Sequence, residues 1–472
     1  MGTFKNRVQQ SSVLSNPHWF FFGMWPACTS WYWLINQVSP LAEGSVLELF
    51  GWQAIFAVQA VASLVMALCF VRKPFSAEPD KRFDVVATVL MMTAILCAVL
   101  PVPGLGAQGR FVVAMVCGGV FVSWEYLRWS VALGWTSAFN IIAVLFVNDA
   151  IAPFAKTMLQ ILPDYAAMAI VLFFPALNFT AVRRVTADFH SGLRPNPAAP
   201  SAAVDKGFLA RLAVSIIVFS FVGSALIALF GIGGDAGVGD YVIWQGSEAI
   251  LAVFILFWVF VHGAGFRFSS IWKFVLARLA AVSVFCVLGI ESPVSRLAAF
   301  GFIDGIWTLI WAVLIDYART RREHPAVIPG IGRSLYTLFF FLGAFTMRTA
   351  GVTELTPSLL LCFLVAIMVA LVLCLDAKTP GMEAVFSELV RVDAPVEEHA
   401  SLDGRCVELG RARGLSDREV EIIALVAKGR SGTYVAEALC ISPNTVKSHM
   451  RRIYEKLDIH SKQELMSLLG VD

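Results

Sequence analysis

The sequence predicts an all-α protein in which a polytopic membrane bundle of about twelve helices, six plus six, precedes a four-helix domain. Of the 472 residues, 58% are apolar and 15% charged, against about 45–50% and about 25% in typical soluble domains. Residues 413–472 hold nine basic and eight acidic residues, whereas the preceding 412 residues share only 53 charges. Soluble cores cannot bury such an apolar excess, which largely excludes a single soluble enzyme or a disordered chain.

Residues 1–376 contain a series of apolar segments, each long enough for a membrane crossing of about 20 residues. A sliding window of about 19 residues places them at 17–37, 49–71, 83–103, 110–130, 133–153, 159–181, 208–231, 242–262, 270–290, 294–316, 334–353 and 357–376. The fifth, ninth and tenth are the least marked. The predicted domains are therefore a membrane bundle at 1–376, a linker at 377–412 and a C-terminal domain at 413–472.

Basic residues in the short loops predict the orientation of the bundle, because Lys and Arg are retained on the cytoplasmic side. With a cytoplasmic N-terminus, the inner segments carry Lys5, Arg7, Arg72, Lys73, Lys81, Arg82, Arg183, Arg184, Arg194, Lys206, Arg267, Arg319, Arg321, Arg322 and Arg333. The opposite side keeps Arg110, Lys156, Arg296 and Arg348. We expect a multi-pass protein of the inner (cytoplasmic) membrane with both ends in the cytoplasm; the loss of one span would move the C-terminal end to the other side.

A polar, Pro-rich stretch at 182–206 separates the sixth and seventh spans. Proline breaks helices and leaves an extended linker. This layout resembles the major facilitator superfamily, whose two halves are related as repeats. The loop signature of that family is only echoed by Asp80-Lys81-Arg82 and lacks its Gly, so transport does not follow from the resemblance.

Ionisable residues at membrane depth are costly and suggest function. Glu248 and Asp304 are the strongest candidates for a ligand or proton site, because both are acidic within apolar flanks. A structural ion pair or an interface position is the alternative. The same choice applies to Glu125, Asp149, Arg211 and Arg278.

Catalysis, cofactors and metals have no support in the sequence. The nine cysteines form no C-x-x-C pair and have no His at ligand spacing, which argues against a zinc site or a disulfide framework. There is no phosphate-binding Gly loop, no pair of carboxylates at catalytic spacing and no nucleophile motif. We therefore expect a protein that is not an enzyme and has no cofactor or metal.

The C-terminal domain is predicted to hold four short helices with clearly marked ends. Ser416 with Glu419 and Ser461 with Glu464 form S-x-x-E capping boxes. Ser431 can cap the second helix. Ser442 is followed by Pro443 at the first position of the third helix, where Pro is favoured.

The third of these helices, 443–457, is predicted to have one buried and one basic face. Its buried positions are Val446, Met450, Ile453 and Leu457, and its outer positions are Asn444, Lys447, Ser448, Arg451 and Glu455. Lys and Arg contact phosphates and guanine edges, and Asn and Ser contact other base edges, so this face suits a DNA major groove. The alternative is an ordinary solvated helix face.

Four segments in order, 415–421 (LSDREVE), 441–449 (ISPNTVKSH), 453–457 (IYEKL) and 461–465 (SKQEL), resemble the LuxR-type helix-turn-helix family. The resemblance implies that double-stranded DNA is bound, with Lys447, Ser448 and Arg451 at base edges. It also implies that the helix after Ser461 helps to form a dimer. Phosphate contacts are implied for Asn444, Thr445, Arg452 and Lys456. The second helix departs from the family pattern, with Gly432-Thr433 at its start and Tyr434 in place of an acidic residue.

Three functions are compatible with these features. The first is a membrane-embedded one-component transcription regulator, in which the bundle senses an unknown small-molecule signal and the tail binds DNA. The second is a secondary transporter with a regulatory helix-turn-helix tail. The third is a tail that binds another protein rather than DNA.

Overall fold

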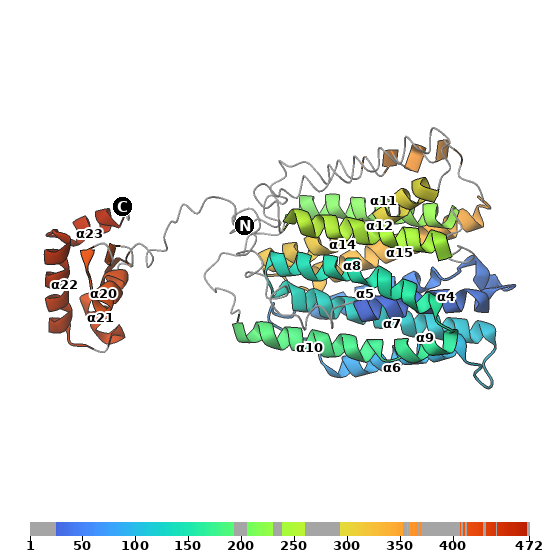
Figure 1. Cartoon of the computed structure of the whole chain (residues 1–472), viewed down its shortest axis with the longest axis horizontal. Helices are drawn as coiled ribbons and strands as arrows, with labels where there is room; N and C mark the ends of the chain where they lie inside the picture. The colour runs from blue at the N-terminus through green and yellow to red at the C-terminus, as the bar shows by residue number, and fades with distance from the viewer. Residues whose placement is uncertain are drawn as a thin grey trace. The chain divides into compact units, whose positions relative to one another are not determined.

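The computed structural model describes residues 25–192, 205–229, 238–259, 293–352, isolated positions between 356 and 410, and residues 413–427, 431–439 and 441–469. The chain forms two compact units, Met1–Arg391 and Val392–Asp472. Regular structure in these ranges is helical (Figure 1), which confirms the predicted all-α class. The ninth predicted span, most of the twelfth, the start of the first and nearly all of the linker at 377–412 lie outside the described residues.

The first half of the membrane bundle contains a helix for each of the first six predicted spans. These helices are α4 (Trp25–Ala42), α5 (Ala54–Phe70), α6 (Arg82–Val99), α7 (Ala107–Gly134), α8 (Ala138–Ile161), and α9 (Asp164–Val171) with α10 (Phe174–Gly192). A short 3-10 helix, η1 (Val46–Leu49), lies between α4 and α5. The fifth span, one of the least marked in the sequence, is therefore a helix.

The second half contains α11 (Lys206–Leu229), α12 (Val238–Phe257), α14 (Pro293–Arg321) and α15 (Val327–Thr349). They correspond to the seventh, eighth, tenth and eleventh predicted spans. Six of the described helical segments are long and apolar enough to cross a membrane. The total of twelve stays a prediction, because two of the spans fall outside the described ranges.

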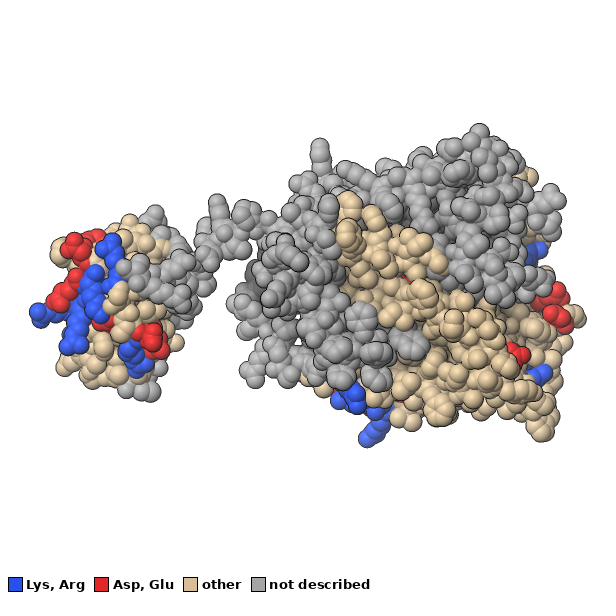
Figure 2. Space-filling model, viewed as in Figure 1, with Lys and Arg blue, Asp and Glu red and all other residues tan. Residues whose placement is uncertain are grey.

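The surface of the bundle is apolar, as contact with lipid requires. Val61, Val65 and Leu68 on α5 and Val85 and Val89 on α6 are all more than half exposed. Figure 2 shows a largely uncharged surface over the described part of this unit. Helices satisfy every interior backbone hydrogen bond within the segment, so this arrangement is stable without water.

Helix α15 packs closely against both α5 and α11 because it carries glycines at the contacts. A Cβ atom on Gly330 would lie 2.8 Å from the Cβ of Ala67 on α5, and a Cβ on Gly343 would clash with the backbone of Phe221 on α11. Small residues at such positions let membrane helices approach one another. This packing joins α15 of the second half to α5 of the first.

Two helices extend further than predicted, and two basic residues change place as a result. Helix α15 begins at Val327 rather than at residue 334, so Arg333 is a buried helical residue and not part of a cytoplasmic loop. Helix α8 continues to Ile161, so Lys156 lies within the helix and not in an outer loop. Hydropathy predicts that each of these spans stops short of its basic residue. In the structure, side chains of neighbouring helices compensate both charges, so the helices continue through them.

The C-terminal unit contains α20 (Asp417–Ala427), α21 (Gly432–Ala438), α22 (Pro443–Leu457) and α23 (Lys462–Leu468). All four predicted helices are present. Oγ of Ser416, Ser431, Ser442 and Ser461 accepts a hydrogen bond from the backbone N–H three residues later. One core joins the helices through Ile423, Val435, Val446, Ile453 and Leu465.

Candidate functional site

Helix α22 is a rigid platform on the C-terminal unit. Ser442 Oγ accepts from the N–H of Thr445 at 3.1 Å, and Pro443 occupies the first turn. The helix ends at Asp458, whose N–H donates to the carbonyl of Tyr454 and whose left-handed φ of 56° lets the N–H of Ile459 reach the same carbonyl at 3.1 Å. Val446, Ile453 and Leu457 are buried, so the orientation of the opposite face is set by the core.

The outward face of α22 carries six of the seven residues predicted to contact DNA without tying them to the rest of the fold. Asn444, Thr445, Lys447, Ser448, Arg451 and Arg452 are all exposed. Figure 2 shows basic side chains gathered on this unit with acidic ones beside them. Arg451 Nε lies 3.1 Å from Glu455 Oε1, with exposed fractions of 84% and 61%. Such an exposed pair contributes little energy, so Arg451 can exchange it for a nucleic-acid contact.

Lys456, the seventh predicted DNA contact, is bonded to the rest of the domain, although its side chain is 40% exposed. Its Nζ lies 2.7 Å from Glu419 Oε2 and 3.1 Å from the carbonyl of Gly414. Burial alone would raise the pKa of the Glu419 carboxyl, but hydrogen bonds from Lys456 and Ser416 outweigh burial and hold this pKa below its ordinary value. Lys456 therefore joins α22 to α20, and its contact with phosphate stays a prediction.

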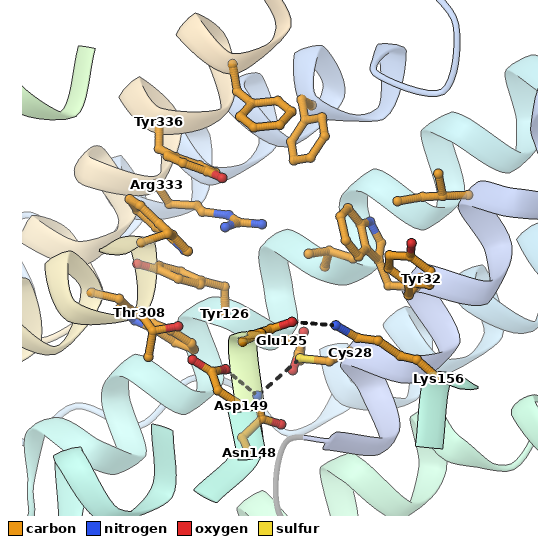
Figure 3. Close-up of a pocket in the computed structure, with 18 of the residues that line it drawn as sticks. Cys28, Tyr32, Glu125, Tyr126, Asn148, Asp149, Lys156, Thr308, Arg333 and Tyr336 are labelled. Carbon is orange, nitrogen blue, oxygen red and sulfur yellow. Dashed lines mark hydrogen bonds and ion pairs between the residues drawn. The ribbon is translucent and has the colours of Figure 1, made fainter. Parts of the chain in front are cut away.

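A second candidate site is a cavity of about 180 Å³ inside the membrane bundle. Residues of both halves line it: α4, α5, α7 and α8 from the first, and α11, α12, α14 and α15 from the second. Aromatic side chains make up much of the wall, and charged groups from several helices converge on the cavity (Figure 3). Buried polar groups around an apolar pocket are the usual form of a small-molecule site.

Acidic and amide side chains line one side of this cavity. Lys156 Nζ lies 3.7 Å from Glu248 Oε2. Asn148 Nδ2 donates to Asp149 Oδ1 at 3.2 Å and contacts Cys28 Sγ at 3.8 Å. Glu125 of α7 faces the same space. These acidic side chains are at most 7% exposed, so their charges interact strongly with anything that enters.

Arg333 occupies the other side of the cavity in an aromatic box. Its guanidinium carbon lies 5.0 Å from the ring centre of Tyr126, 5.4 Å from that of Trp307 and 5.5 Å from that of Tyr336. Nη2 donates to Gln59 Oε1 at 2.8 Å. Cation–π contacts of this kind stabilise a desolvated guanidinium, which explains how α15 buries a charge.

The structure describes the side chain of only one of the two membrane residues predicted as a ligand or proton site. Glu248 lines the cavity. Asp304 lies on α14 four residues before Thr308, which lines the cavity, but the side chain of Asp304 is outside the described part. Sequence reasoning missed Arg333 and Lys156, although each stands in a mainly apolar run that could have been extended through the charge.

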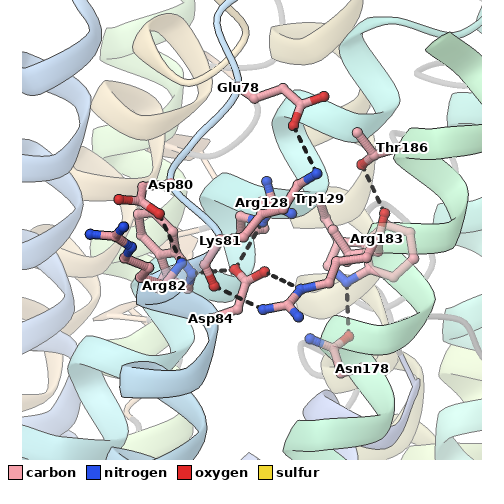
Figure 4. Close-up of polar contacts among 12 residues, drawn as sticks. Glu78, Asp80, Lys81, Arg82, Asp84, Arg128, Trp129, Asn178, Arg183 and Thr186 are labelled. Carbon is pink, nitrogen blue, oxygen red and sulfur yellow. Dashed lines mark hydrogen bonds and ion pairs between the residues drawn. The ribbon is translucent and has the colours of Figure 1, made fainter.

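A third cluster lies where α6 begins and joins three helices of the first half (Figure 4). Asp84 Oδ1 lies 3.0 Å from Arg128 Nε and accepts from Trp124 Nε1 at 2.9 Å. Asp84 Oδ2 lies 2.9 Å from Arg183 Nε, and Arg183 Nη2 donates to the carbonyl of Lys81 at 2.8 Å. The sequence drew attention to the exposed Asp80, whereas the buried acid of this region is Asp84.

Comparison with known proteins identifies the C-terminal unit. Residues 413–469 match the family described as bacterial regulatory proteins, luxR family, and form a LuxR-type helix-turn-helix domain. "Oxygen regulatory protein NreC" of Staphylococcus haemolyticus is 48% identical over 52 residues, 11% of this chain and 24% of that protein. "Response regulator UvrY" of Escherichia coli is 41% identical over 54 residues, 11% of this chain and 25% of that protein. The match thus spans about a quarter of the length of these relatives.

Among solved structures, a bacterial homologue of the iron transporter ferroportin in an outward-facing state with soaked iron is 12% identical, with a TM-score of 0.47. That alignment covers 75% of this chain and 98% of the other. The major facilitator superfamily transporter FucP in its outward conformation is 11% identical with a TM-score of 0.38, covering 74% of this chain and 97% of the other.

Proposed function

We propose that this chain is a bacterial, membrane-embedded transcription regulator that binds double-stranded DNA through α22 and responds to a small-molecule signal in the cavity of its bundle. The observation that carries the proposal is the outward face of α22, where exposed Lys447, Ser448 and Arg451 stand on a capped helix anchored by the core. The printed names of the relatives, which include a "Transcriptional activator protein ExaE" of Pseudomonas putida, support a role in transcription.

The outward face of α22 divides into two kinds of contact in this proposal. Lys447, Ser448 and Arg451 read base edges in the major groove, while Asn444, Thr445 and Arg452 hold phosphates. Lys456 contributes positive charge while it stays bound to Glu419. Helix α23 supplies the dimer contact, since Leu468 on that helix is 47% exposed.

Basic groups gathered at one end of the bundle support a cytoplasmic position for both chain ends. Arg183 in the middle of α10 contacts Lys81 and Asp84 at the start of α6. His324, which follows α14, contacts the carbonyl of Ala77 at 3.0 Å. The loops rich in Lys and Arg therefore meet at one end, which under the positive-inside rule faces the cytoplasm of the inner membrane.

Genome-wide DNA occupancy of the full-length chain, with membranes intact, tests the DNA-binding part. Arg451→Ala should remove the specific peaks, because one good base contact is worth about 1–3 kcal/mol. Arg452→Ala should weaken binding at all sites and reduce the slope of log K against log salt by about one.

Arg413→Ala is the matched control, because it removes an equal charge from an exposed residue that is not on α22. Unchanged occupancy in Arg451→Ala, with a flat salt dependence in the parent, would contradict DNA binding and favour a tail that binds protein.

A secondary transporter is the second candidate, and the buried charged cavity between the two halves of the bundle favours it. Uptake into vesicles that stops when the ion gradient is collapsed, and that is lost in Glu248→Gln, would support transport. A chain that controls transcription without such uptake would leave the cavity as a sensor alone.

A further inference from the structure

We propose that the bundle cavity binds a compact organic ammonium ion, that is, a protonated amine attached to an apolar or aromatic body. This deepens the proposed function by naming the chemical class of the signal. Binding follows from the cavity itself, and only its effect on DNA rests on the proposed function. The binding of the ammonium ion and its effect on DNA affinity can therefore be disproved independently.

The charges around the cavity leave it short of positive charge. Three carboxylates line it, from Glu125, Asp149 and Glu248, against the two cations Lys156 and Arg333. Lys156 is paired with Glu248, and Arg333 is engaged by Gln59 and three aromatic rings. One negative charge therefore remains in the lining, and a monovalent ligand cation beside Glu125 and Asp149 would neutralise it.

Acceptor atoms lack donors on the side of the cavity formed by Glu125, Asn148 and Asp149, whereas the unpartnered donors of the lining, Trp31 Nε1 and Arg333 Nε, belong to its aromatic walls. Three acceptor atoms have no hydrogen-bond partner among the residues that the structure describes, Glu125 Oε1, Asn148 Oδ1 and Asp149 Oδ2, while Glu248 Oε2 faces Lys156. Their side chains are no more than 8% exposed, and a buried acceptor without a donor costs about 1–3 kcal/mol. An ammonium group carries three donors and no acceptor, so it matches this set.

The walls and size of the cavity suit the rest of such a ligand. Trp31, Trp52, Phe56 and Phe340 present aromatic surface to the space, and aromatic rings attract organic cations as well as apolar bodies. The volume of about 180 Å³ exceeds that of an engineered cavity of about 150 Å³ that accepts benzene. One aromatic ring with a short aminoalkyl chain therefore fits.

A bare metal ion fits this cavity less well than an organic cation. Among the residues described, no three or more Asp, Glu, His or Cys side chains lie close enough together to hold a metal. Metal sites in proteins take several oxygen, nitrogen or sulfur ligands at short range. The separated carboxylates and the aromatic walls favour the organic ion.

The experiment measures binding to the purified full-length chain in lipid nanodiscs by calorimetry, with 2-phenylethylammonium as the probe. Comparison compounds are neutral 2-phenylethanol, anionic 3-phenylpropanoate and Mn²⁺ alone. We expect saturable binding of the ammonium ion, at least about tenfold tighter than that of the alcohol or the carboxylate, because a buried charge pair is worth a tenfold change or more.

Two neutral variants and one control test the residues. Glu125→Gln and Asp149→Asn should each weaken binding of the ammonium ion by about tenfold or more, while Glu43→Gln, which neutralises an exposed loop carboxylate, should bind like the parent. Folding is checked by the melting temperature, which neutralising an uncompensated buried charge should leave unchanged or raise. No binding of the ammonium ion, equal binding of the alcohol, tighter binding of Mn²⁺, or parental affinity in both variants would each overturn the inference.

DNA binding of the same preparations separates this inference from the proposed function. The cavity variants without probe should bind DNA as the parent does, and the probe should change the DNA affinity of the parent only. Probe binding with no effect on DNA would uphold the ammonium site and contradict the signalling role. DNA binding by a chain that does not bind the probe would contradict the ammonium site and leave the DNA-binding part of the proposed function intact.

Discussion

At the scale of single residues, the structure separates basic side chains that the sequence treats alike. Arg451 and Lys456 lie on the same helix, and both count toward its positive charge. Arg451 is 84% exposed, whereas Lys456 Nζ is bonded to Glu419 and to the carbonyl of Gly414. The surface available for DNA recognition is therefore smaller than the number of basic residues on α22 indicates, because Lys456 stabilises the domain instead.

The Glu419 contact predicts how the C-terminal unit responds to acid. Its pKa is lowered in the folded state from an ordinary value of about 4.3. The stabilisation is therefore fully present above that ordinary value and is lost as the pH falls through the lowered one. Hydrogen–deuterium exchange in α20 and α22 of the full-length chain should accelerate below about pH 4.3 in the parent.

Glu419→Gln should exchange faster at neutral pH, by the equivalent of about 1–2 kcal/mol, and should respond less to acid than the parent. Glu464, whose pKa is lowered by hydrogen bonds from His460 and Ser461, remains in both chains, so the difference between them isolates Glu419. Glu421→Gln, at an exposed ion pair with Arg418, is the control and should match the parent. An equal acid response in parent and Glu419→Gln would contradict the assignment.

At the scale of elements, buried polar clusters hold helices together where apolar packing in lipid gives no driving force. Asp84 of α6 meets Arg128 of α7 and Arg183 of α10, and both Asp84 and Arg128 are 1% exposed. Removing one partner of such a pair leaves an uncompensated buried charge, whereas replacing both by apolar groups does not.

Asp84→Asn should therefore destabilise the bundle by about 3–5 kcal/mol, measured by unfolding of the detergent-solubilised full-length chain. The double variant Asp84→Leu/Arg128→Met should be less destabilised than the single one. Asp80→Asn is the control: Asp80 is exposed and accepts a hydrogen bond from the N–H of Arg82, which an Asn oxygen can also accept. A double variant as unstable as the single one would show that the ion pair is not the source of the effect.

Element boundaries were predictable in one unit and poorly predictable in the other. The predicted third helix of the C-terminal domain, 443–457, has the bounds of α22, because Ser442 and Pro443 mark its start in the sequence. In the bundle, α8 and α15 pass through Lys156 and Arg333. Hydropathy along the sequence cannot predict this, because it contains no information on which charges a neighbouring helix compensates.

At the scale of the whole molecule, the proposed orientation can be tested without reference to DNA. Lys73 and Gln108 are exposed at opposite ends of the bundle, before α6 and at the start of α7. Lys73→Cys should resist a membrane-impermeant maleimide in intact cells, and Gln108→Cys should react with it. A C-terminal reporter should be active in the cytoplasm.

The parent chain, with its native cysteines, measures the background of this labelling. Reversed labelling of the two cysteines would contradict the proposed orientation of the bundle, and a C-terminal reporter that is inactive in the cytoplasm would contradict regulation of transcription by this chain.

The sequence by itself determined the helical class, the division into a lipid-soluble and a charged part, and the recognition helix with its caps. These features depend on composition and on residues a few positions apart, which local rules describe. Only the tertiary structure decided that Glu125, Asp149 and Glu248 face one cavity, that Arg333 is buried among three rings and that Asp84 is the central acid of its cluster. Those residues come from helices far apart in the chain, and the interaction of buried charges depends on distances that no local pattern contains.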